Sequence, residues 1–361
     1  MATKLLMKGN EALAEAAIRA GLKAYFGYPI TPQSELLEYL VRELPKRGGA
    51  ILQAESEIAS INMVYGAAAT GERVMTSTSS PGFSLMQEGI SYIACAELPC
   101  LLVNVMRGGP GLGTIQPGQC DYFQAVKGGG HGDYRMIVLA PGSVQEMADF
   151  VYLGFDLADK YRIPVLILTD GALGQMMEMV EFPEYDIEAH LVDHSSWATT
   201  GKKKGSERHI ITSLFLDPEI LENVNLHLQK KYDTIREKEV RYEAVMTDDA
   251  DFIVVAYGLS ARVSHKAIEM GRQEGMKVGL LRPQTLFPFP SEQLNALADH
   301  VNGILVVEMS AGQMVEDVRL SVDGKVPVEF YGRMGGMIPA PEEILNEINR
   351  FYSQKLIEET F

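Results

Sequence analysis

Short, nearly continuous apolar segments alternate along the first half of the chain with longer stretches of helical periodicity. The apolar segments are KAYFGYP, RVMTSTSS, PCLLVNVM, MIVLAP and PVLILTD. Strands of a parallel sheet covered on both faces lose their polar alternation, because neither face meets water. The pattern therefore predicts that residues 1 to about 180 form a doubly wound, mostly parallel α/β domain.

The periodic pattern is lost after this region. Residues 181 to about 215 combine charges, a lysine run at 202–204 and turn residues, so we predict a linker or surface excursion there. Residues 216–248 form a charged segment that we predict to be helical. The expected domains are therefore 1–215, including the linker, and 216–361.

A second alternating series follows the charged segment. DFIVVAYG, MKVGLLRPQTLFPFP, GILVVEM and VPVEFYG are apolar, and the stretches between them have helical periodicity over 261–273, 291–298 and 311–320. This series predicts a second, smaller α/β domain.

Composition and charge narrow the class of protein. The 361 residues are 46% apolar and 22% charged, and no apolar run approaches the ~20 residues that span a bilayer. The N-terminal segment MATKLLMKGNEALAEAAIRAG has a helical pattern rather than the apolar core of a signal peptide. A net charge of −16 argues against a basic nucleic-acid-binding face. Cys95, Cys100 and Cys120 are too few for a disulfide framework or a four-thiolate iron–sulfur cluster, so we expect a reducing cytoplasm.

The segment GYPITPQSELLEYL predicts a rigid corner between a strand and a helix. Pro29 ends the strand and pushes Tyr28 into extended geometry, and we expect Thr31 at the helix N-cap with Pro32 at the first helical position. The corner is either a tight turn with a purely structural role or a hydroxyl held where open α/β sheets bind ligands. The motif by itself leaves both interpretations open.

Four longer blocks carry a family resemblance. YPITP, AESEIASINMVYGAAATGERVMTSTSSPGFSLMQEGI, MRGGPGLGTIQPGQCDYFQAVKGGGHGDYR and VLAPGSVQEM resemble the α subunit of 2-oxoacid:ferredoxin oxidoreductases, which are thiamine-diphosphate enzymes. The resemblance covers essentially the whole chain. It implies a thiamine-diphosphate-binding fold of the pyrimidine type, followed by a domain similar to the transketolase C-terminal domain.

The glycine-rich block around Arg107 resembles the branched-chain (2-oxoisovalerate) members more than the 2-oxoglutarate members. This implies oxidative decarboxylation of a branched-chain 2-oxo acid with coenzyme A to acyl-CoA, CO₂ and reduced ferredoxin. A 2-oxoglutarate or pyruvate substrate is the alternative within the family, and a noncatalytic scaffold subunit is the alternative outside catalysis.

Glu57 is the candidate acid. Thiamine diphosphate is activated when a carboxylic acid in an apolar site shares a proton with its aminopyrimidine ring. AESEIASINMVYGAAATG supplies two acids followed by an uncharged helix pattern up to Glu72. From the residues alone, both carboxylates could simply favour a helix N-terminus. The resemblance assigns the proton relay to Glu57 and leaves that structural role to Glu55.

Arg107 is the candidate group for the carboxylate of a 2-oxo acid. It follows the apolar run PCLLVNVM, and a forked guanidinium at the end of a strand suits a planar carboxylate. Gly108 and Gly109 allow close approach of the backbone. The resemblance implies that Arg107 and Thr31 hold the substrate; an arginine that merely closes the sheet edge is the alternative.

Other residues are weaker candidates. The resemblance places Ser80, Pro81 and Gly82 of the loop TSTSSPGF against the cofactor, together with Tyr28 and Pro29 of the corner. The spacing in GGPGLG does not match a dinucleotide fingerprint, so we do not expect NAD.

His131, in GGGHGDYR, is either a proton-transfer group or a local hydrogen-bond anchor, and the sequence leaves both open. Met176, Met177 and Met179 are expected to pack as apolar side chains rather than to bind a metal.

The sequence lacks part of the expected cofactor site. In this cofactor class a Gly-Asp-Gly motif with a following Asn holds the Mg²⁺ of the diphosphate, and Asp170-Gly171 in TDGALGQ has no such Asn. We therefore assign no metal ligand here and expect a β subunit to carry the diphosphate/Mg²⁺ site, across a large, apolar, obligate interface at which the second domain packs. The 4Fe-4S clusters are expected on partners such as a ferredoxin-like δ subunit. Because the chain begins directly at the YPITP domain, a γ subunit is also expected as a separate protein.

Overall fold

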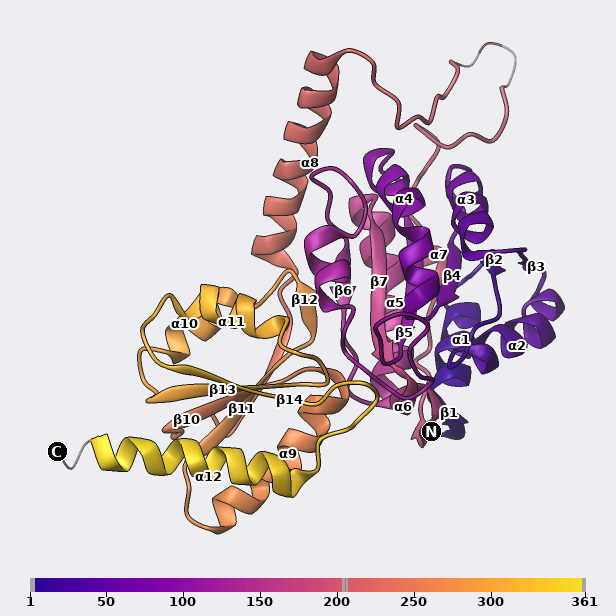
Figure 1. The fold of residues 1–361 in the computed structure, drawn as a ribbon. Coiled ribbons are helices and arrows are strands. Elements are labelled where there is room, and N and C mark those ends of the chain that lie inside the picture. The colour runs from indigo at the N-terminus through magenta and orange to yellow at the C-terminus, as the bar shows by residue number, and fades with distance from the viewer. Residues whose placement is uncertain (1–3, 203–204, 206, 359–361) are drawn as a thin grey trace.

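The computed structural model describes residues 4–202, 205 and 207–358, which form two α/β halves, each around its own sheet (Figure 1). The first sheet has seven strands in the order β12-β6-β7-β5-β4-β2-β3, all parallel to their neighbours except β12 against β6. Its strands are β2 (Ala24–Gly27), β3 (Ala50–Gln53), β4 (Val74–Thr78), β5 (Cys100–Met106), β6 (Ile137–Leu139), β7 (Pro164–Asp170) and β12 (Thr285–Phe287). The predicted doubly wound, mostly parallel fold is confirmed.

Helices cover both faces of the first sheet. α1 (Gly9–Arg19) packs against α5 (Val144–Tyr161) and α2 (Ser34–Glu43) on one face, and α3 (Glu57–Ala68) packs against α4 (Ser80–Cys95) on the opposite face. Because both faces are covered, every residue of β5 and β7 is buried, which explains their apolar sequences without alternation.

The second half contains a five-stranded sheet in the order β14-β13-β10-β11-β9. β9 is antiparallel to β11 and the other pairs are parallel. Around this sheet α9 packs against α12, and α10 packs against α11. The elements are α8 (Pro218–Lys238), β9 (Tyr242–Val245), β10 (Phe252–Val255), α9 (Gly258–Gln273), β11 (Val278–Pro283), α10 (Ser291–Leu297), β13 (Gly303–Glu308), α11 (Met314–Val322), β14 (Val328–Gly332) and α12 (Pro341–Glu358).

The two halves are tied together by a strand and by a buried glutamine. β12 comes from the second series of elements but pairs with β6 of the first sheet. Gln119 is fully buried between the halves; its side chain donates to Tyr257 O at 2.9 Å and accepts from Ser260 Oγ at 2.7 Å and Met309 N at 2.9 Å. These contacts fix loop 107–121 of the first half against the second half.

The helix predicted over 216–248 is wrong at its C-terminal end. α8 stops at Lys238, and the chain then forms the edge strand β9. Glu239, directly after the helix, is buried and accepts hydrogen bonds from Lys160 and Tyr161 of α5, at 2.7 and 2.6 Å. Tertiary contacts therefore end the helix where the local charge pattern would have continued it.

The prediction that Met177 and Met179 pack as buried apolar side chains is also wrong. β1 (Leu5–Lys8) and β8 (Met177–Val180) form a two-stranded antiparallel ribbon. Met177 and Met179 are 55% and 54% exposed, because alternate residues of an outlying ribbon face solvent. Met176 is half-buried against the core, as predicted.

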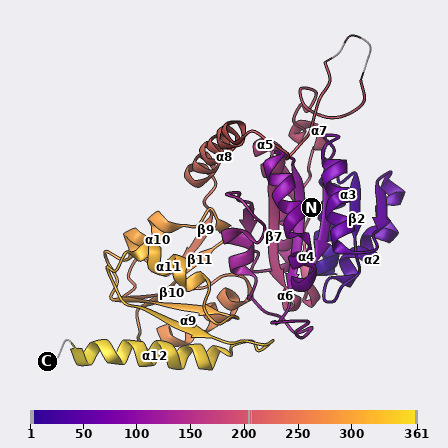
Figure 2. The same ribbon diagram turned by 45° about the horizontal axis from the view of Figure 1, so that its top comes forward.

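The remaining segments are short or irregular. The region predicted as a linker contains α7 (Ile187–His190) (Figures 1 and 2). Part of the irregular chain after α7 packs on the first half, where Thr199 N donates to Ala69 O at 2.8 Å. Lys202 is exposed, as predicted, whereas residues 203 and 204 of the lysine run lie outside the described residues. None of the described helices is both long and apolar enough to cross a membrane. The other short elements are η1 (Pro45–Arg47), η2 (Gln124–Gly128) and α6 (Gly171–Gln175).

Candidate functional site

Four neighbouring strands, β5, β4, β2 and β3, end at one edge of the first sheet, and each is followed by a predicted site residue. Arg107 follows β5, Ser80 follows β4, Thr31 follows β2 and Glu57 follows β3. The carboxyl ends of parallel strands are where open α/β sheets bind ligands. The topology thus brings together residues that are separated by up to 76 positions in the sequence.

Glu57 is a buried carboxylate at the start of α3. Ser56 caps the helix by accepting from Ala59 N at 3.2 Å, which places Glu57 in the first turn with 4% of its surface exposed. No hydrogen bond reaches its carboxylate from any described residue. Glu55 precedes the helix and is exposed, so the two acids lie in different environments.

Gly82 makes room for the Glu57 carboxylate. A Cβ at position 82 would overlap both Glu57 Oε1 and Thr78 Oγ1. Ser80, Pro81 and Gly82 form the first turn of α4, so the acid lies against a helix N-terminus. Among the residues predicted in this loop, position 82 therefore requires glycine, because any side chain there would overlap Glu57 and Thr78.

Arg107 lies immediately beyond β5 and reaches across to the YPITP corner. Its Nη1 donates to Thr31 O at 3.0 Å and its Nη2 donates to Leu112 O at 2.8 Å. Its Nε is buried and has no hydrogen-bond partner among the described residues. Arg107 and Thr31 are therefore in contact, and three N–H groups of the guanidinium remain unpaired in the described structure.

The expected capping at the corner is wrong. α2 begins at Ser34 rather than at Pro32, and Thr31 is exposed instead of serving as the N-cap. The N–H of Gln33 donates to Ile30 O at 3.1 Å, which closes a separate turn before the helix begins. This extra turn leaves the Thr31 side chain open at the sheet edge and its carbonyl directed at Arg107.

Gln33 holds the corner from inside. Its Nε2 donates to Tyr28 O at 3.1 Å, and its Oε1 accepts from Ser77 Oγ at 2.7 Å, which in turn lies 2.6 Å from Tyr25 Oη. The side chains of Gln33, Ser77 and Tyr25 are fully buried, whereas Tyr28 is half-buried and Pro29 is exposed. The corner is therefore held by the side-chain hydrogen bonds of Gln33 as well as by its two prolines. The sequence pattern did not reveal this role of Gln33.

Asp121, Asn104 and Cys120 are site residues that sequence reasoning missed. They lie behind Arg107 and Ser80, and Asp121 Oδ2 is 2.5 Å from Ser80 Oγ. Burial raises the pKa of both Asp121 and Cys120, the latter to about 11. The available signal was an acid within the glycine-rich block, at QCDY.

A cavity of about 420 Å³ adjoins this edge of the sheet, between the two halves. It is lined by the first turns of α4, by loop 108–111, by Cys120 and Asp121, and by second-half loops that include Met309 and Met334. Of the predicted site residues, Ser80 and Pro81 line this cavity, so the second half lies beside that part of the candidate site.

Exposed apolar side chains occur on several of the elements that carry the site and on neighbouring loops. They extend from the end of β3, α3 and α4 to the glycine-rich loop and the segment after β14: Leu52, Ile58, Leu85, Leu112, Ile115, Met334, Met337 and Ile338. Large exposed apolar patches mark interaction surfaces. We call these eight residues the apolar rim.

Asp170 has a structural role in the described chain. Its Oδ1 accepts from Ala172 N at 2.9 Å and Leu173 N at 3.2 Å, which caps α6, and burial raises its pKa to about 6. Across the described residues there is no group of three or more His, Cys, Asp or Glu side chains arranged to hold a metal ion.

His131 is exposed and contacts Tyr92 edge-on, with ring centroids 6.5 Å apart. The three cysteines form no disulfide. These positions give no geometric sign of a second reactive centre.

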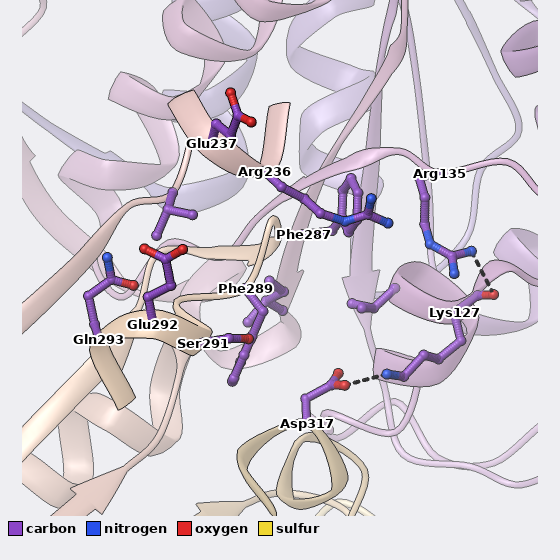
Figure 3. A pocket seen from close by; sticks show the side chains of 13 residues that line it. Lys127, Arg135, Arg236, Glu237, Phe287, Phe289, Ser291, Glu292, Gln293 and Asp317 are labelled. Carbon is purple, nitrogen blue, oxygen red and sulfur yellow. Dashed lines mark hydrogen bonds and ion pairs between the residues drawn. The ribbon is translucent and has the colours of Figure 1, made fainter. Parts of the chain in front are cut away.

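A second cavity, of about 510 Å³, lies at the seam between the halves and contains none of the predicted site residues (Figure 3). Two of its cations are already engaged: Lys127 forms an ion pair with Asp317, and Arg236 pairs with Asp233 at 2.6 Å and lies over the Phe287 ring. We therefore place the candidate site at the sheet edge and not at this seam.

Comparison with known proteins gives consistent matches. Residues 15–247 match the family of pyruvate flavodoxin/ferredoxin oxidoreductases, thiamine-diphosphate-binding, and residues 250–344 match core domain II of pyruvate:ferredoxin oxidoreductase. Ketoisovalerate oxidoreductase subunit VorB of Methanothermobacter thermautotrophicus is 54% identical, over 96% of this chain and 97% of that protein. The 2-oxoglutarate synthase subunit KorA of Methanothermobacter marburgensis is 38% identical, over 96% of this chain and 99% of that protein.

A solved structure agrees with these matches. The 2-oxoglutarate:ferredoxin oxidoreductase from Magnetococcus marinus superposes with a TM-score of 0.87 at 30% identity. The match covers 96% of this chain but 65% of that longer chain. That protein was solved with 2-oxoglutarate, coenzyme A and succinyl-CoA bound.

Proposed function

Because this chain belongs to the 2-oxoacid:ferredoxin oxidoreductases, as a subunit of a thiamine-diphosphate-dependent enzyme, we propose that its enzyme oxidatively decarboxylates a branched-chain 2-oxo acid, 2-oxoisovalerate. The products would be acyl-CoA, CO₂ and reduced ferredoxin, with coenzyme A as co-substrate. The higher identity to the ketoisovalerate relative, 54% against 38% for the 2-oxoglutarate relative, supports this substrate.

The burial of Glu57 against Gly82 is the observation that carries the proposal. Glu57 is buried as a residue at the carboxyl end of the sheet, and no described residue donates a hydrogen bond to its carboxylate, so its oxygens remain available to a ligand. The residues fit thiamine diphosphate, since its aminopyrimidine ring requires an acid, and Glu57 presents a carboxylate without a hydrogen-bond donor among the described residues, beside Gly82 at the carboxyl end of the sheet. We assign to Glu57 the role of holding and sharing a proton with that ring.

The bound cofactor would supply the nucleophilic carbon that attacks the 2-oxo group. Arg107 would bind the substrate carboxylate through its unpaired N–H groups, oriented by its bond to Thr31 O. Thr31 would complete the substrate contact with its exposed hydroxyl. Tyr28, Pro29 and the first turn of α4, including Ser80 and Pro81, are our candidates for contact with the cofactor.

The apolar rim supports a partner that covers the site. Its eight side chains are exposed on elements that carry the site or adjoin it, which fits a large, obligate subunit interface. We propose that a β subunit docks there and carries the diphosphate and Mg²⁺, because Asp170 is committed to capping α6. Separate γ and ferredoxin-like δ subunits, the latter with 4Fe-4S clusters, would complete the enzyme.

The test is the assembled enzyme with Glu57→Gln. We expect turnover with 2-oxoisovalerate and coenzyme A to fall by about 10²–10⁴-fold, the usual contribution of a positioned acid–base group. Glu55→Gln is the matched control, since that acid is exposed outside the helix, and it should retain activity. Unchanged turnover in Glu57→Gln would refute the relay role.

Two further measurements separate the alternatives. A panel of 2-oxoisovalerate, 2-oxoglutarate and pyruvate identifies the substrate by kcat/KM. Calorimetric titration of thiamine diphosphate into the complex and into the partner subunits alone tests the scaffold alternative, which predicts equal affinity in both.

A further inference from the structure

Asp121 is a buried carboxylate directly behind Arg107. The residue is 8% exposed, and its Oδ2 accepts from Asn104 Nδ2 at 2.9 Å and lies 2.5 Å from Ser80 Oγ. Asn104 belongs to β5 and Ser80 to the first turn of α4. The carboxylate therefore joins two neighbouring elements at the point where Arg107 leaves the sheet.

The proton of the Ser80 hydroxyl can be assigned from the distances. The hydroxyl lies 2.5 Å from Asp121 Oδ2 but 3.3 Å from Arg107 O, so its single proton goes to the carboxylate. Its lone pair then accepts the Arg107 N–H, with N···O at 3.1 Å. The result is one directed chain, from the Arg107 N–H through Ser80 to Asp121.

The other side of the same residue is also held. The thiol of Cys120 lies 3.4 Å from Arg107 O and 3.7 Å from Asp121 Oδ1. The backbone of Arg107 is thus anchored at both its N–H and its carbonyl. Because an arginine side chain is long and flexible, its guanidinium can be aimed reproducibly only if its Cα is fixed.

We propose that Asp121 is a positioning residue, which through Ser80 fixes the Arg107 backbone and so aims the guanidinium at Thr31 and the substrate carboxylate. The proposal rests on the proposed function of Arg107 as the carboxylate-binding group. Asp121 itself need not touch the substrate.

The deciding variant is Asp121→Ala, made in the assembled enzyme. We expect KM for 2-oxoisovalerate to rise about ten- to a hundredfold, as for loss of a buried hydrogen bond to a charged group, with kcat changing less. Calorimetry should show that the affinity for thiamine diphosphate falls much less than KM rises, because Asp121 is not among the candidate cofactor contacts and reaches them only through Ser80. A merely structural role would lower the melting temperature without this selective rise in KM.

Two other variants, Asp121→Asn and Ser80→Ala, test the inference if the Asp121→Ala enzyme does not assemble. Asp121→Asn retains an oxygen that can accept from Ser80 and should raise KM less than Asp121→Ala. Ser80→Ala removes the link but keeps the carboxylate, and should raise KM nearly as much; titration of thiamine diphosphate into this variant shows how much of the change comes from a lost cofactor contact of Ser80. Normal KM in Ser80→Ala and in whichever Asp121 variant assembles would overturn the inference.

The Arg107→Met background separates this inference from the proposed function. If Asp121 acts through Arg107, adding Asp121→Ala to Arg107→Met leaves KM unchanged, whereas an independent role multiplies the two effects. If Arg107→Met alone leaves KM unchanged, the substrate role of Arg107 fails. If it raises KM but Asp121→Ala does not, only the positioning role fails.

Glu239→Gln is the control for burial of a carboxylate in general. Glu239 is at least as buried as Asp121 but pairs with Lys160 and Tyr161, outside the candidate site. This variant should lower the melting temperature and leave KM for the 2-oxo acid unchanged.

Discussion

Two arginines beside the first sheet show how differently its two ends are built. Arg73, just before β4, is buried and makes five hydrogen bonds: to Asp159 Oδ2, Asp156 Oδ1, Tyr185 Oη, Ala20 O and His190 O, at 2.8–3.4 Å. Arg107, just after β5, bonds two carbonyl oxygens and leaves Nε buried without a partner among the described residues. A saturated guanidinium stabilises a fold, whereas an unsaturated one retains hydrogen-bonding capacity for a ligand.

The carboxylates repeat the contrast. Asp159, at the amino end of the sheet, faces Arg73 at 2.8 Å, whereas Glu57, at the carboxyl end, is buried and receives no hydrogen bond from any described residue. Of these four charged groups, Arg73 and Asp159 at the amino end pair with each other, whereas Arg107 and Glu57 at the carboxyl end keep hydrogen-bonding capacity among the described residues. Proteins characteristically give up stability in this way at functional sites.

Arg73→Met should have the largest effect, and it should fall on stability. Breaking a buried ion pair by removing one partner leaves Asp159 buried and uncompensated, which costs about 3–5 kcal/mol. Thermal unfolding of the assembled enzyme should shift strongly downward, with KM unchanged in the enzyme that remains folded. A melting temperature equal to that of the wild type would contradict the proposed division between the two ends.

Arg107→Met should have the next largest effect, and it should fall on activity. Loss of the charged fork should lower kcat/KM for the 2-oxo acid about a hundredfold, or about 2.7 kcal/mol of transition-state stabilisation. The melting temperature should change little, because only two hydrogen bonds to carbonyl oxygens are lost. Steady-state kinetics with 2-oxoisovalerate check the first expectation and calorimetry checks the second.

Glu57→Met should separate activity from stability at the carboxyl end of the sheet. Replacing this carboxylate by an apolar side chain of similar length should not destabilise the enzyme, because no hydrogen bond from a described residue is lost, while it abolishes turnover. Differential scanning calorimetry measures the melting temperature. A lower melting temperature would show that Glu57 contributes to folding and would weaken its assignment to the cofactor.

Asp170→Asn should have the smallest effect, a change in how the melting temperature depends on pH. Burial raises the pKa of Asp170 to about 6 from a usual value of 3.8, so the folded state binds the proton more tightly than the unfolded state. The stability that this provides is complete below the usual pKa and is lost as the pH rises through about 6. The difference in melting temperature between the two proteins should therefore change between about pH 4 and 7, and a constant difference would argue against the raised pKa.

Much of the fold and part of the site follow from local patterns. The buried strands β5 and β7 were predictable because an apolar run without alternation is typical of a strand covered on both faces. Arg107 and Glu57 were predictable as candidates because each lies in a block that resembles the family, Arg107 directly after an apolar run and Glu57 at the start of a helix pattern. Edge strands such as β3 and β9 were missed because each has only four residues, too few to give a clear periodic or apolar signal.

The residues that support the site were not predictable in this way. Gln33 and Asp121 act through partners 44 and 41 positions away, and Gly82 acts through contact with another helix. Single polar residues and glycines have no distinctive local pattern that would reveal such partners. The start of α2 was misplaced for a different, local reason. A hydrogen bond from the Gln33 N–H to Ile30 O decided it, against the propensities of Thr31 and Pro32.

Taken alone, the sequence determined the class of the fold, the order of its main strands and helices, and which strand ends carry acids, arginines and hydroxyls, because burial and periodicity are encoded locally. Only the tertiary structure decided which of these groups meet: the strand order places Arg107 beside Thr31 and Glu57 beside Gly82. It also decided which polar groups stay unpaired among the described residues, because hydrogen-bond satisfaction depends on distant partners. That distinction separates the structural Arg73 from the functional candidate Arg107.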